Sequence, residues 1–519
     1  MNRNPTLGLL AAAVLAIGAT DLSAQVSFIT GTVVDAFGAV QPSVNIAVEN
    51  NGSGGDPDVF NGGTNLFGNF NTTVDPAGTY DVVFRPAAPN LITRIIDVPI
   101  SGTLDMGTVV MDLGVILSGR LLDPLGLPVD GVNLDLVDLD TGNQVELTGD
   151  KSDALGQFAF AIPTGNFELR LNATPVPFPV LASQAFDITV TGDTNLGDIT
   201  MQEGFKITTI VQQAGFVPVE NADTDTVDVL TGDKLYTPGD NTDAFGLVTV
   251  TVPAGNYHFQ ICAPPGSQLV DHEITPVLVA ANVNLGLTVM EAGMTLTGTV
   301  VDSGGQPIAG IDIDVEDSTT LLKQLTCNDN TNGAGVYSVV VPAGTWNVRF
   351  TPKFSQPYGT AEVFNVAVAG TTTVNGQLPD CAFSTQYGAG VAGAGGLVPL
   401  LSSSGGAPRL GNPDYTVELS NGLGGAVAPV MLGFGAGALP FKGGVLLIDL
   451  TAGPFLLFNL PLSGPAGVPG AGSFSLPAAV PVDPVIVGFS IYVQFFVPDP
   501  SVPLFGLAFS NGLQITYCD

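Results

Sequence analysis

The chain has 519 residues, of which 45% are hydrophobic and only 12% are charged, and its net charge is −34. Such an acidic surface repels phosphate groups, which argues against nucleic acid or anionic lipid as the partner. The 66 glycines and 39 prolines argue against long helices and predict frequent turns.

Residues 1–24 have the pattern of a signal peptide. Arg3 supplies the positive charge, residues 7–19 form a short apolar segment, and Ala24 is a small residue suited to cleavage. A buried N-terminal helix is the alternative. No other segment has the roughly 18 continuous apolar residues that a membrane helix needs, and the β-branched and aromatic run at 485–497 favours a strand. We therefore expect a secreted or cell-surface protein without a transmembrane anchor.

Four copies of one unit follow the signal peptide. A Pro-x-Gly motif recurs in all of them, with its glycine at Gly78, Gly165, Gly255 and Gly344. A second motif places Asn or Asp three residues before a glycine, and a third places a glycine near the end of each unit. Because all three motifs keep the same period, they predict four domains. The expected bounds are 25–113, 114–202, 203–291 and 292–379.

Each unit reads as a series of strands. After Pro-x-Gly, apolar and polar residues alternate strictly, as in Trp346, Val348 and Phe350 of the fourth copy. This pattern is typical of a half-buried strand. About seven short strands with turn signals every 8–12 residues indicate an all-β fold of tandem seven-stranded antiparallel β-sandwiches. Units of this size can bury their own cores, so we expect beads on a string and not a solenoid.

The repeats resemble a known family. The segment "LTGTVVDSGGQPIAGIDIDVED" followed by "TNGAGVYSVVVPAGTWNVRF" in the fourth copy is similar to the carboxypeptidase regulatory-like module, a prealbumin-type sandwich. The second copy matches equally well, and the third departs most because it lacks the usual Gly and Asp near its start. The resemblance covers roughly residues 28–378. It implies a fold and no activity, since such modules occur in peptidases, transporters and surface proteins alike.

Residues 380–519 break the period and form the last predicted domain. They open with "CAFSTQYGAGVAGAGGLVPL" and resemble a C-terminal β module of exported planctomycete-type proteins. In that module two positions are often cysteines. This chain has Val391 and Val445 at those positions and so lacks the two cysteines. Short apolar runs separated by Gly and Pro predict a jelly-roll-like β-sandwich.

The four cysteines of an exported chain can form disulfides. Cys381 and Cys518 bracket the last domain, and the ends of a domain usually lie close together, so we expect these two to pair. Pairing of either with another cysteine, or buried free thiols, are the alternatives. Whether Cys262 and Cys327 meet across two adjacent repeats stays open.

The sequence offers little for catalysis. His258 points outward from a predicted strand, and His272 with Glu273 lacks the second histidine of a zinc-binding helix. There is no Gly-x-Ser-x-Gly motif and no phosphate-binding loop. We therefore expect no enzyme activity and no cofactor.

A cation site is the next possibility. Asp312, Asp314 and Glu316 share one face of a predicted strand, and residues 328–333 resemble the opening of a calcium loop. Position twelve of that loop would be Val339, which cannot ligate. A solvated strand face and a turn are the simpler interpretation, so no metal site is predicted.

Two other features could carry function. Trp346 would suit sugar stacking, but it occupies a position that is aromatic in every copy, which favours the core. Lys206 could form an isopeptide bond with Asn282 or Asn284, assisted by Glu220, as in pilin-type domains of related fold; an exposed lysine is the alternative.

Together these features predict a non-enzymatic surface or matrix protein with an adhesion, spacer or display role. Its partner would be an unknown surface polymer or protein. The alternative is a carbohydrate-binding protein, since the sandwich resembles starch-binding modules. The aromatic candidates for that role are Phe178, Tyr236 and Tyr358.

Overall fold

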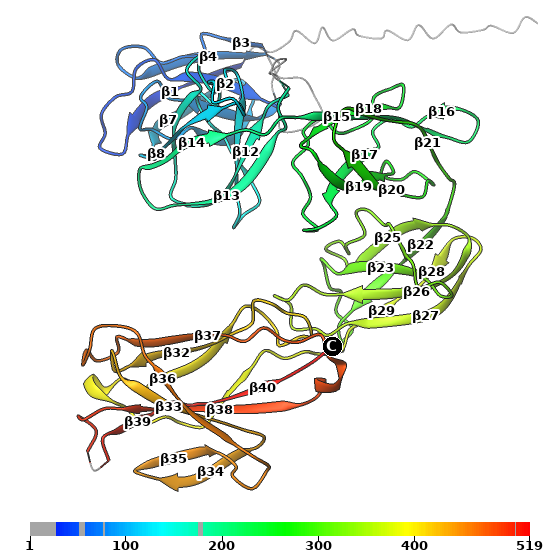
Figure 1. Cartoon of the computed structure of the whole chain (residues 1–519). Helices are drawn as coiled ribbons and strands as arrows, with labels where there is room; N and C mark the ends of the chain where they lie inside the picture. Colours follow the sequence, from blue (N-terminus) through cyan, green and yellow to red (C-terminus); the bar gives the residue numbers. More distant parts are fainter. Residues whose placement is uncertain (1–26, 51–57, 76–77, 175–179, 504) are drawn as a thin grey trace, which may run out of the picture.

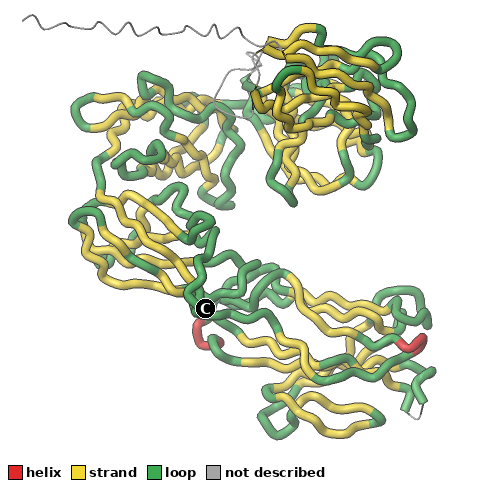
Figure 2. Tube along the Cα trace, turned by 180° about the vertical axis from the view of Figure 1, so that it is seen from behind, coloured by secondary structure: helices red, strands yellow, loops and turns green. Residues whose placement is uncertain are grey.

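The structure is a computed structural model that describes residues 27–50, 58–75, 78–174, 180–503 and 505–519. Within these ranges every regular element is a strand except two short 3-10 turns, η1 (Ala394–Gly396) and η2 (Pro484–Ile486), as Figure 2 shows. The predicted all-β class is confirmed. The predicted signal peptide lies outside the described residues, and no helix within them has the length and hydropathy required to span a bilayer.

The first two repeats are sandwiches of two sheets each (Figure 1). In the first, the sheets have the orders β3-β4-β1-β7 and β2-β5-β6, and in the second β11-β8-β14 and β10-β9-β12-β13. Their strands are β1 (Ser27–Asp35), β2 (Asn45–Glu49), β3 (Asp58–Phe60), β4 (Asn69–Asp75), β5 (Gly78–Arg85), β6 (Arg94–Ile100), β7 (Thr103–Met111), β8 (Val115–Leu122), β9 (Asn133–Asp138), β10 (Gln144–Val145), β11 (Gln157–Ile162), β12 (Gly165–Asn172), β13 (Gln184–Val190) and β14 (Thr194–Thr200).

The third and fourth repeats have the same plan. Their sheets are β16-β15-β18 with β21 and β17-β19-β20, then β25-β22-β28 with β29 and β24-β23-β26-β27. Their strands are β15 (Phe205–Gln213), β16 (Val217–Pro218), β17 (Asp223–Asp228), β18 (Leu247–Val252), β19 (Gly255–Cys262), β20 (His272–Val279), β21 (Val283–Met290), β22 (Met294–Val301), β23 (Asp312–Asp317), β24 (Lys323–Gln324), β25 (Val336–Val341), β26 (Gly344–Thr351), β27 (Ala361–Val368), β28 (Thr372–Thr373) and β29 (Gly376–Gln377).

One pair in each repeat is parallel, although the other described strand pairs of the repeats are antiparallel. The last strand runs alongside the first in the same direction: β7 with β1, β14 with β8, and β21 with β15. In the fourth repeat the last strand is split into β28 and β29, and both pair with β22. A parallel pair needs a long connection, and here the rest of the repeat provides it.

The glycine near the end of each unit forms a bulge in this parallel pair. Gly107, Gly197 and Gly286 have φ of +63°, +70° and +75°, a region that favours glycine. In each case the Asx residue two positions earlier accepts a hydrogen bond from the glycine N–H, as Asn284 does at 2.8 Å. The ladder shifts register at this point. The third sequence motif is therefore a bulge signal.

The glycine of Pro-x-Gly has a different role. As a turn motif, Pro-x-Gly predicts a backbone conformation at its glycine that β-branched residues resist, and this prediction is wrong. Gly255 is not among the residues with positive φ. A Cβ on it would instead lie 2.4 Å from the Tyr257 hydroxyl oxygen. The ring of Tyr257 folds back over the glycine, and its hydroxyl donates to the Pro253 carbonyl at 3.0 Å. Trp346 does the same in the fourth repeat, where its indole N–H donates to the Pro342 carbonyl at 3.0 Å. The motif therefore makes room for an aromatic ring.

The C-terminal domain has three layers. A six-stranded sheet, β30-β40-β38-β33-β36 with β39 on β38, lies between the sheet β31-β32-β37 and the hairpin β34-β35. Its strands are β30 (Thr385–Tyr387), β31 (Leu400–Ser404), β32 (Thr416–Gly422), β33 (Val427–Gly433), β34 (Ala436–Phe441), β35 (Gly444–Ile448), β36 (Leu456–Pro461), β37 (Gly472–Pro477), β38 (Ser490–Pro498), β39 (Leu507–Phe509) and β40 (Gly512–Thr516).

This third layer explains the apolar run at 485–497. Residues Val493 to Val497 of β38 are buried in succession, because β38 is covered on both faces. Gln494 is fully buried and fixes the hairpin to β38. Its side chain accepts from the Leu447 N–H at 2.8 Å and donates to the carbonyls of Val445 and Ser510 at 3.1 Å. The hairpin is thus held by hydrogen bonds as well as by apolar packing.

Candidate functional site

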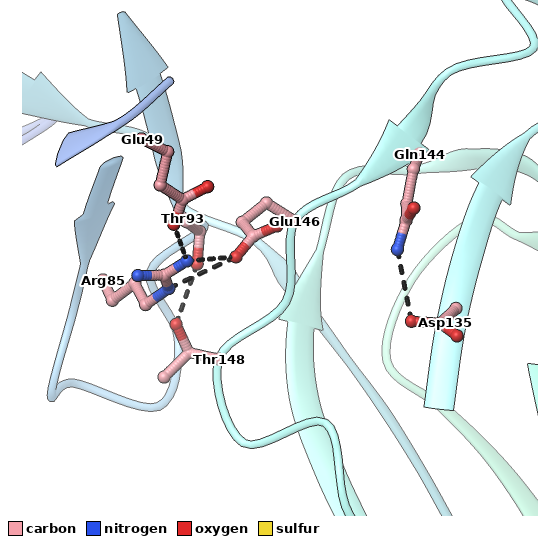
Figure 3. Close-up of polar contacts among 7 residues, drawn as sticks. All are labelled: Glu49, Arg85, Thr93, Asp135, Gln144, Glu146 and Thr148. Carbon is pink, nitrogen blue, oxygen red and sulfur yellow. Dashed lines mark hydrogen bonds and ion pairs between the residues drawn. The ribbon is translucent and has the colours of Figure 1, made fainter. Parts of the chain in front are cut away.

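The joints between successive domains carry the most specific chemistry in the described chain. At the joint between the first and second repeats, Arg85 at the end of β5 reaches Glu146 of the second repeat (Figure 3). Its Nη2 atom lies 2.6 Å from Glu146 Oε1 and 2.7 Å from Glu49 Oε1. The hydroxyls of Thr93 and Thr148 add a hydrogen bond of 2.8 Å across the joint. One half-buried guanidinium therefore joins two domains.

A disulfide takes this place between the third and fourth repeats. Cys262 at the end of β19 is bonded to Cys327, and their Cα atoms are 5.6 Å apart. The pairing that the sequence left open is thus formed in the structure. The Asp271 carboxylate accepts hydrogen bonds from the backbone N–H groups of Ala263 and Cys327, at 2.6 and 2.7 Å. Burial raises the pKa of Asp271, while these two hydrogen bonds lower it.

The two joints use equivalent positions. Cys262 stands five residues after Tyr257, as Arg85 stands five after Tyr80. On the receiving side, Cys327 stands five residues before the Asx turn of its repeat, as Thr148 does in the second. The disulfide of one joint and the ionic contact of the other therefore start from the same position of the fold and reach the same loop of the next repeat, at positions two residues apart.

The joint between the second and third repeats is held by stacking. The Arg170 guanidinium lies over the Tyr236 ring, with its carbon 5.3 Å from the ring centre. Tyr236 occupies the position equivalent to Glu146, seven residues before the Asx turn. These side chains line a cleft of about 730 Å³ with residues of both repeats, among them Gln184 and Lys234. As at the first joint, an arginine of one repeat contacts a side chain of the next repeat.

The joint between the fourth repeat and the C-terminal domain is built around Arg409. Arg409 is buried, donates to the Pro352 carbonyl, and lies 4.4 Å from the centre of the Phe354 ring. Burial lowers the pKa of Arg409. The backbone N–H of Thr360 donates to the carbonyl oxygen of the last residue, Asp519, at 2.7 Å. The chain end is therefore part of this joint.

Cys381 and Cys518 lie at the same joint. They are joined as a disulfide, and their Cα atoms are 5.8 Å apart. The Cys381 N–H also donates to the Pro357 carbonyl of the fourth repeat at 2.8 Å. We propose that this bond fastens both ends of the C-terminal domain where it meets the repeats, and the test is given in the Discussion.

Acidic clusters recur on the outer face of the third and fourth repeats. In the third, Asp223, Asp225 and Asp240 bring their carboxylates within 4.8 Å of one another, and Lys234 pairs with Asp225. In the fourth, the equivalent group is Asp312, Asp314 and Asp329, with Lys323 paired to Asp314. Each cluster already contains a lysine cation, which offsets one of its three negative charges.

The other residues proposed for a cation site give it no support. Glu316 is half-buried on the same strand, and Val339 is buried in the core. Asn332 of the suggested calcium loop accepts from the N–H groups of Ala334 and Val336, which makes it a turn residue.

The cluster of the fourth repeat should make its stability depend on pH. Burial raises the pKa of Asp329 to about 6, with the charges of Asp312 and Asp314 adding to the shift. Because the folded state holds this proton more tightly than the unfolded chain, repeat stability should fall by about 1–3 kcal/mol as pH rises from 4 to 7. Asp329→Asn should weaken this dependence and stabilise the repeat at neutral pH, while Asp312, whose pKa burial also raises, retains a part of it.

Trp346, the single tryptophan, lies in the core of this repeat, so its fluorescence reports unfolding. Asp317→Asn is a matched control, since hydrogen bonds from Thr320 and Thr319 lower the pKa of Asp317, and the profile between pH 4 and 7 should keep the slope of wild type. A parallel pH profile for wild type and Asp329→Asn would contradict the assignment.

The remaining sequence candidates are separated or used otherwise. His258 Nδ1 lies 2.7 Å from Thr275 Oγ1 and 3.4 Å from Glu273 Oε1. Both partners contact the same ring nitrogen, so the histidine cannot relay a proton between them. His272 lies at the start of the neighbouring strand β20.

The isopeptide hypothesis is not supported. The Lys206 side chain is exposed, and so is Glu220. Asn282 accepts from the Lys206 backbone N–H at 2.9 Å, and Asn284 belongs to the bulge. An isopeptide bond requires a lysine, an amide and an acid enclosed together, which these residues are not.

The aromatic candidates also differ from their expected roles. Trp346 is core, as expected, with only 6% of its surface exposed. Tyr236 lies in a joint, Tyr358 packs against the core of the fourth repeat, and Phe178 is outside the described residues.

Sequence reasoning missed a pair of exposed loop tips on each of the first three repeats. In the third these are Phe216 and Phe245, which are 79% and 78% exposed. The first has Phe37 and Phe67, and the second has leucines at the equivalent positions. The signal was a large apolar residue next to the glycine of a turn, directly before it at Phe37, Phe67 and Phe245 and directly after it at Phe216.

Comparison with known proteins does not assign this chain to a family. No family model and no curated sequence matches the chain. Among solved structures it is similar to the TIE protein of Bacillus anthracis, with 14% identity, 70% of this chain and 75% of that chain covered, and a TM-score of 0.17. A streptococcal ancillary pilin has 15% identity, coverages of 51% and 99%, and a TM-score of 0.17. The shaft pilin SpaA of Lactobacillus rhamnosus GG has 13% identity, coverages of 34% and 97%, and the same TM-score. At these TM-scores we draw no functional conclusion from them.

Proposed function

We propose that this chain is an exported, non-enzymatic structural protein that acts as a spacer or display arm at the cell surface or in a secreted matrix. The observation that supports this function is the tie at every joint: an ion cluster, a cation–aromatic stack, a disulfide and a buried arginine. All of these ties join the strand that follows Pro-x-Gly, or the residues directly after it, to a loop of the next domain.

The connections between the repeats favour the same function. Three to four residues separate the last strand of one repeat from the first of the next, as between Met111 and Val115. Such short linkers together with side-chain ties restrict relative rotation, whereas long linkers leave domains free. The five domains then follow a curved path (Figures 1 and 2), which holds one end of the protein at a set distance from the other.

Four further assignments are part of this proposal. They are the predicted domain bounds, cleavage after residue 24, the resemblance of the repeats to carboxypeptidase regulatory-like modules, and that of residues 380–519 to the C-terminal module of exported proteins. The partner would be an unidentified surface polymer or protein.

Loss of the inter-repeat disulfide should loosen the arm. Cys262→Ser/Cys327→Ser removes the tie between the third and fourth repeats, so the distance between them should fluctuate more widely. Dyes at the exposed positions Leu278 and Phe364, attached through non-natural amino acids, would report this distance by single-molecule energy transfer. Wild type should give one narrow distribution and the variant a broad one.

Arg409→Ala is a suitable control, because it loosens only the joint beyond the fourth repeat and should leave this distribution narrow. A broad distribution in wild type would overturn the fixed-joint proposal.

Carbohydrate binding is the second candidate, and the exposed loop tips favour it. Pairs of aromatic rings such as Phe216 and Phe245 could stack on sugar rings. A glycan array on the mature protein separates the two functions. Specific binding that is lost in Phe216→Ala/Phe245→Ala would favour this second function over a purely structural one.

A further inference from the structure

The outer edge of β36 is uncharged and apolar, unlike the described edge strands of the repeats. Within the described residues β36 pairs with β33 on one side only. Its side chains are exposed on both faces, with Leu456 62% and Leu457 59% exposed. The whole segment 450–482 contains no charged residue. Unpaired backbone groups are therefore flanked by apolar side chains, an arrangement that promotes pairing with another strand.

Other edges of this protein are protected against such pairing. The edge strands β6, β13, β20 and β27 of the repeats all carry acidic residues, and two of them carry a proline; these residues are Asp97, Pro99, Asp187, Glu273, Pro276 and Glu362. In the C-terminal domain, β34 contains Pro440 and a register shift, and Lys442 follows it. Charges, prolines and bulges are the common means of blocking edge pairing. The strand β36 has no charged residue and no register shift, and its one proline, Pro461, stands at its last position.

We propose that β36 pairs antiparallel with β36 of a second copy of this chain, so that the protein is a homodimer joined through its C-terminal domains. Antiparallel pairing of a strand with itself obeys two-fold symmetry and places the same apolar side chains against each other.

The charge distribution identifies the second copy as the occupant. Residues 25–380 carry 40 acidic and 10 basic side chains, whereas residues 381–519 carry six and two. The repeats of two copies therefore repel each other, and the C-terminal domain is where copies can approach. A cationic partner would bind the acidic repeats in preference to an uncharged strand. The C-terminal domain lies at one end of the curved path (Figure 1), so pairing there leaves the repeats of both copies free.

Sedimentation velocity of the mature chain tests the proposal. Wild type should show a mass of two chains that falls towards one on dilution from about 100 to about 1 μM. Leu457→Lys places two like charges close together in the paired strands and should raise the dissociation constant at least about tenfold. Leu439→Lys, on the protected strand β34, and Leu278→Lys, in the third repeat, add the same charge at leucines that are 53% and 73% exposed. Both should remain dimeric.

A single-chain mass for wild type at every concentration overturns the proposal, as does an unchanged mass for a folded Leu457→Lys variant. Near-ultraviolet circular dichroism shows whether the variant is folded. If it is not, hydrogen–deuterium exchange of wild type decides: peptides covering residues 454–461 should exchange more slowly at high than at low concentration, and equal rates exclude the interface.

Discussion

Replacing Cys381 and Cys518 by serine should lower the free energy of unfolding of the C-terminal domain by about 4–5 kcal/mol in the chain-entropy model, because the bond closes a long loop. The two residues are 137 positions apart and the structure joins them. The loss would appear as a lower midpoint denaturant concentration for the unfolding of this domain. Near-ultraviolet circular dichroism is the signal that monitors this unfolding. Trp346 fluorescence follows the fourth repeat in the same samples.

Cys262→Ser/Cys327→Ser is the matched control, since it removes a disulfide without touching this domain; the midpoint of the C-terminal domain should stay in place. Peptide mapping without reduction gives an independent answer. A linked peptide that joins Cys381 or Cys518 to any other cysteine, or two free thiols, would refute the proposed bond.

Gly255→Val should destabilise the third repeat by about 3 kcal/mol, the sum of overpacking and a lost hydrogen bond. The new Cβ would lie 2.4 Å from the Tyr257 hydroxyl oxygen and 2.5 Å from its Cζ. The ring would have to leave its place in the core and its hydrogen bond to Pro253. Calorimetry should show an earlier transition for this repeat, while the first and second repeats keep theirs.

Two further variants test the cause. Gly165→Val should cost less, because the equivalent Phe167 ring has no hydroxyl and its Cζ lies 3.1 Å from the new Cβ. Tyr257→Phe combined with Gly255→Val removes the closest atom and should recover part of the loss. Equal losses at both glycines, or one cooperative transition for all four repeats, would contradict this explanation.

The fold was largely predictable because its local signals are strong. Strict alternation after Pro-x-Gly identified β12, β19 and β26, and the apolar run at 485–497 identified β38 as a strand. The reason for Gly255 was not predictable, since a sequence motif gives the position of a glycine and not its φ or the ring above it.

The joints could not be predicted from such signals. Arg85 and Glu146 are 61 residues apart, and Cys262 and Cys327 are 65 apart. Nothing in the local pattern around these residues marks them as partners, because their contact depends on how two finished domains dock. Equivalent positions in successive repeats indicate which residues form a joint only when the contacts of one joint are already known.

The parallel pairing of the first and last strands has a mechanical consequence. In each repeat the chain enters at the start of the first strand and leaves at the end of the last, and these two strands lie side by side in the same direction. Tension applied along the chain therefore pulls the two strands past each other lengthwise. On either side of the bulge the hydrogen bonds between them are evenly spaced, so they share the load, whereas strands peeled apart from one end would lose them one at a time. A repeat built in this way resists stretching through its own connectivity.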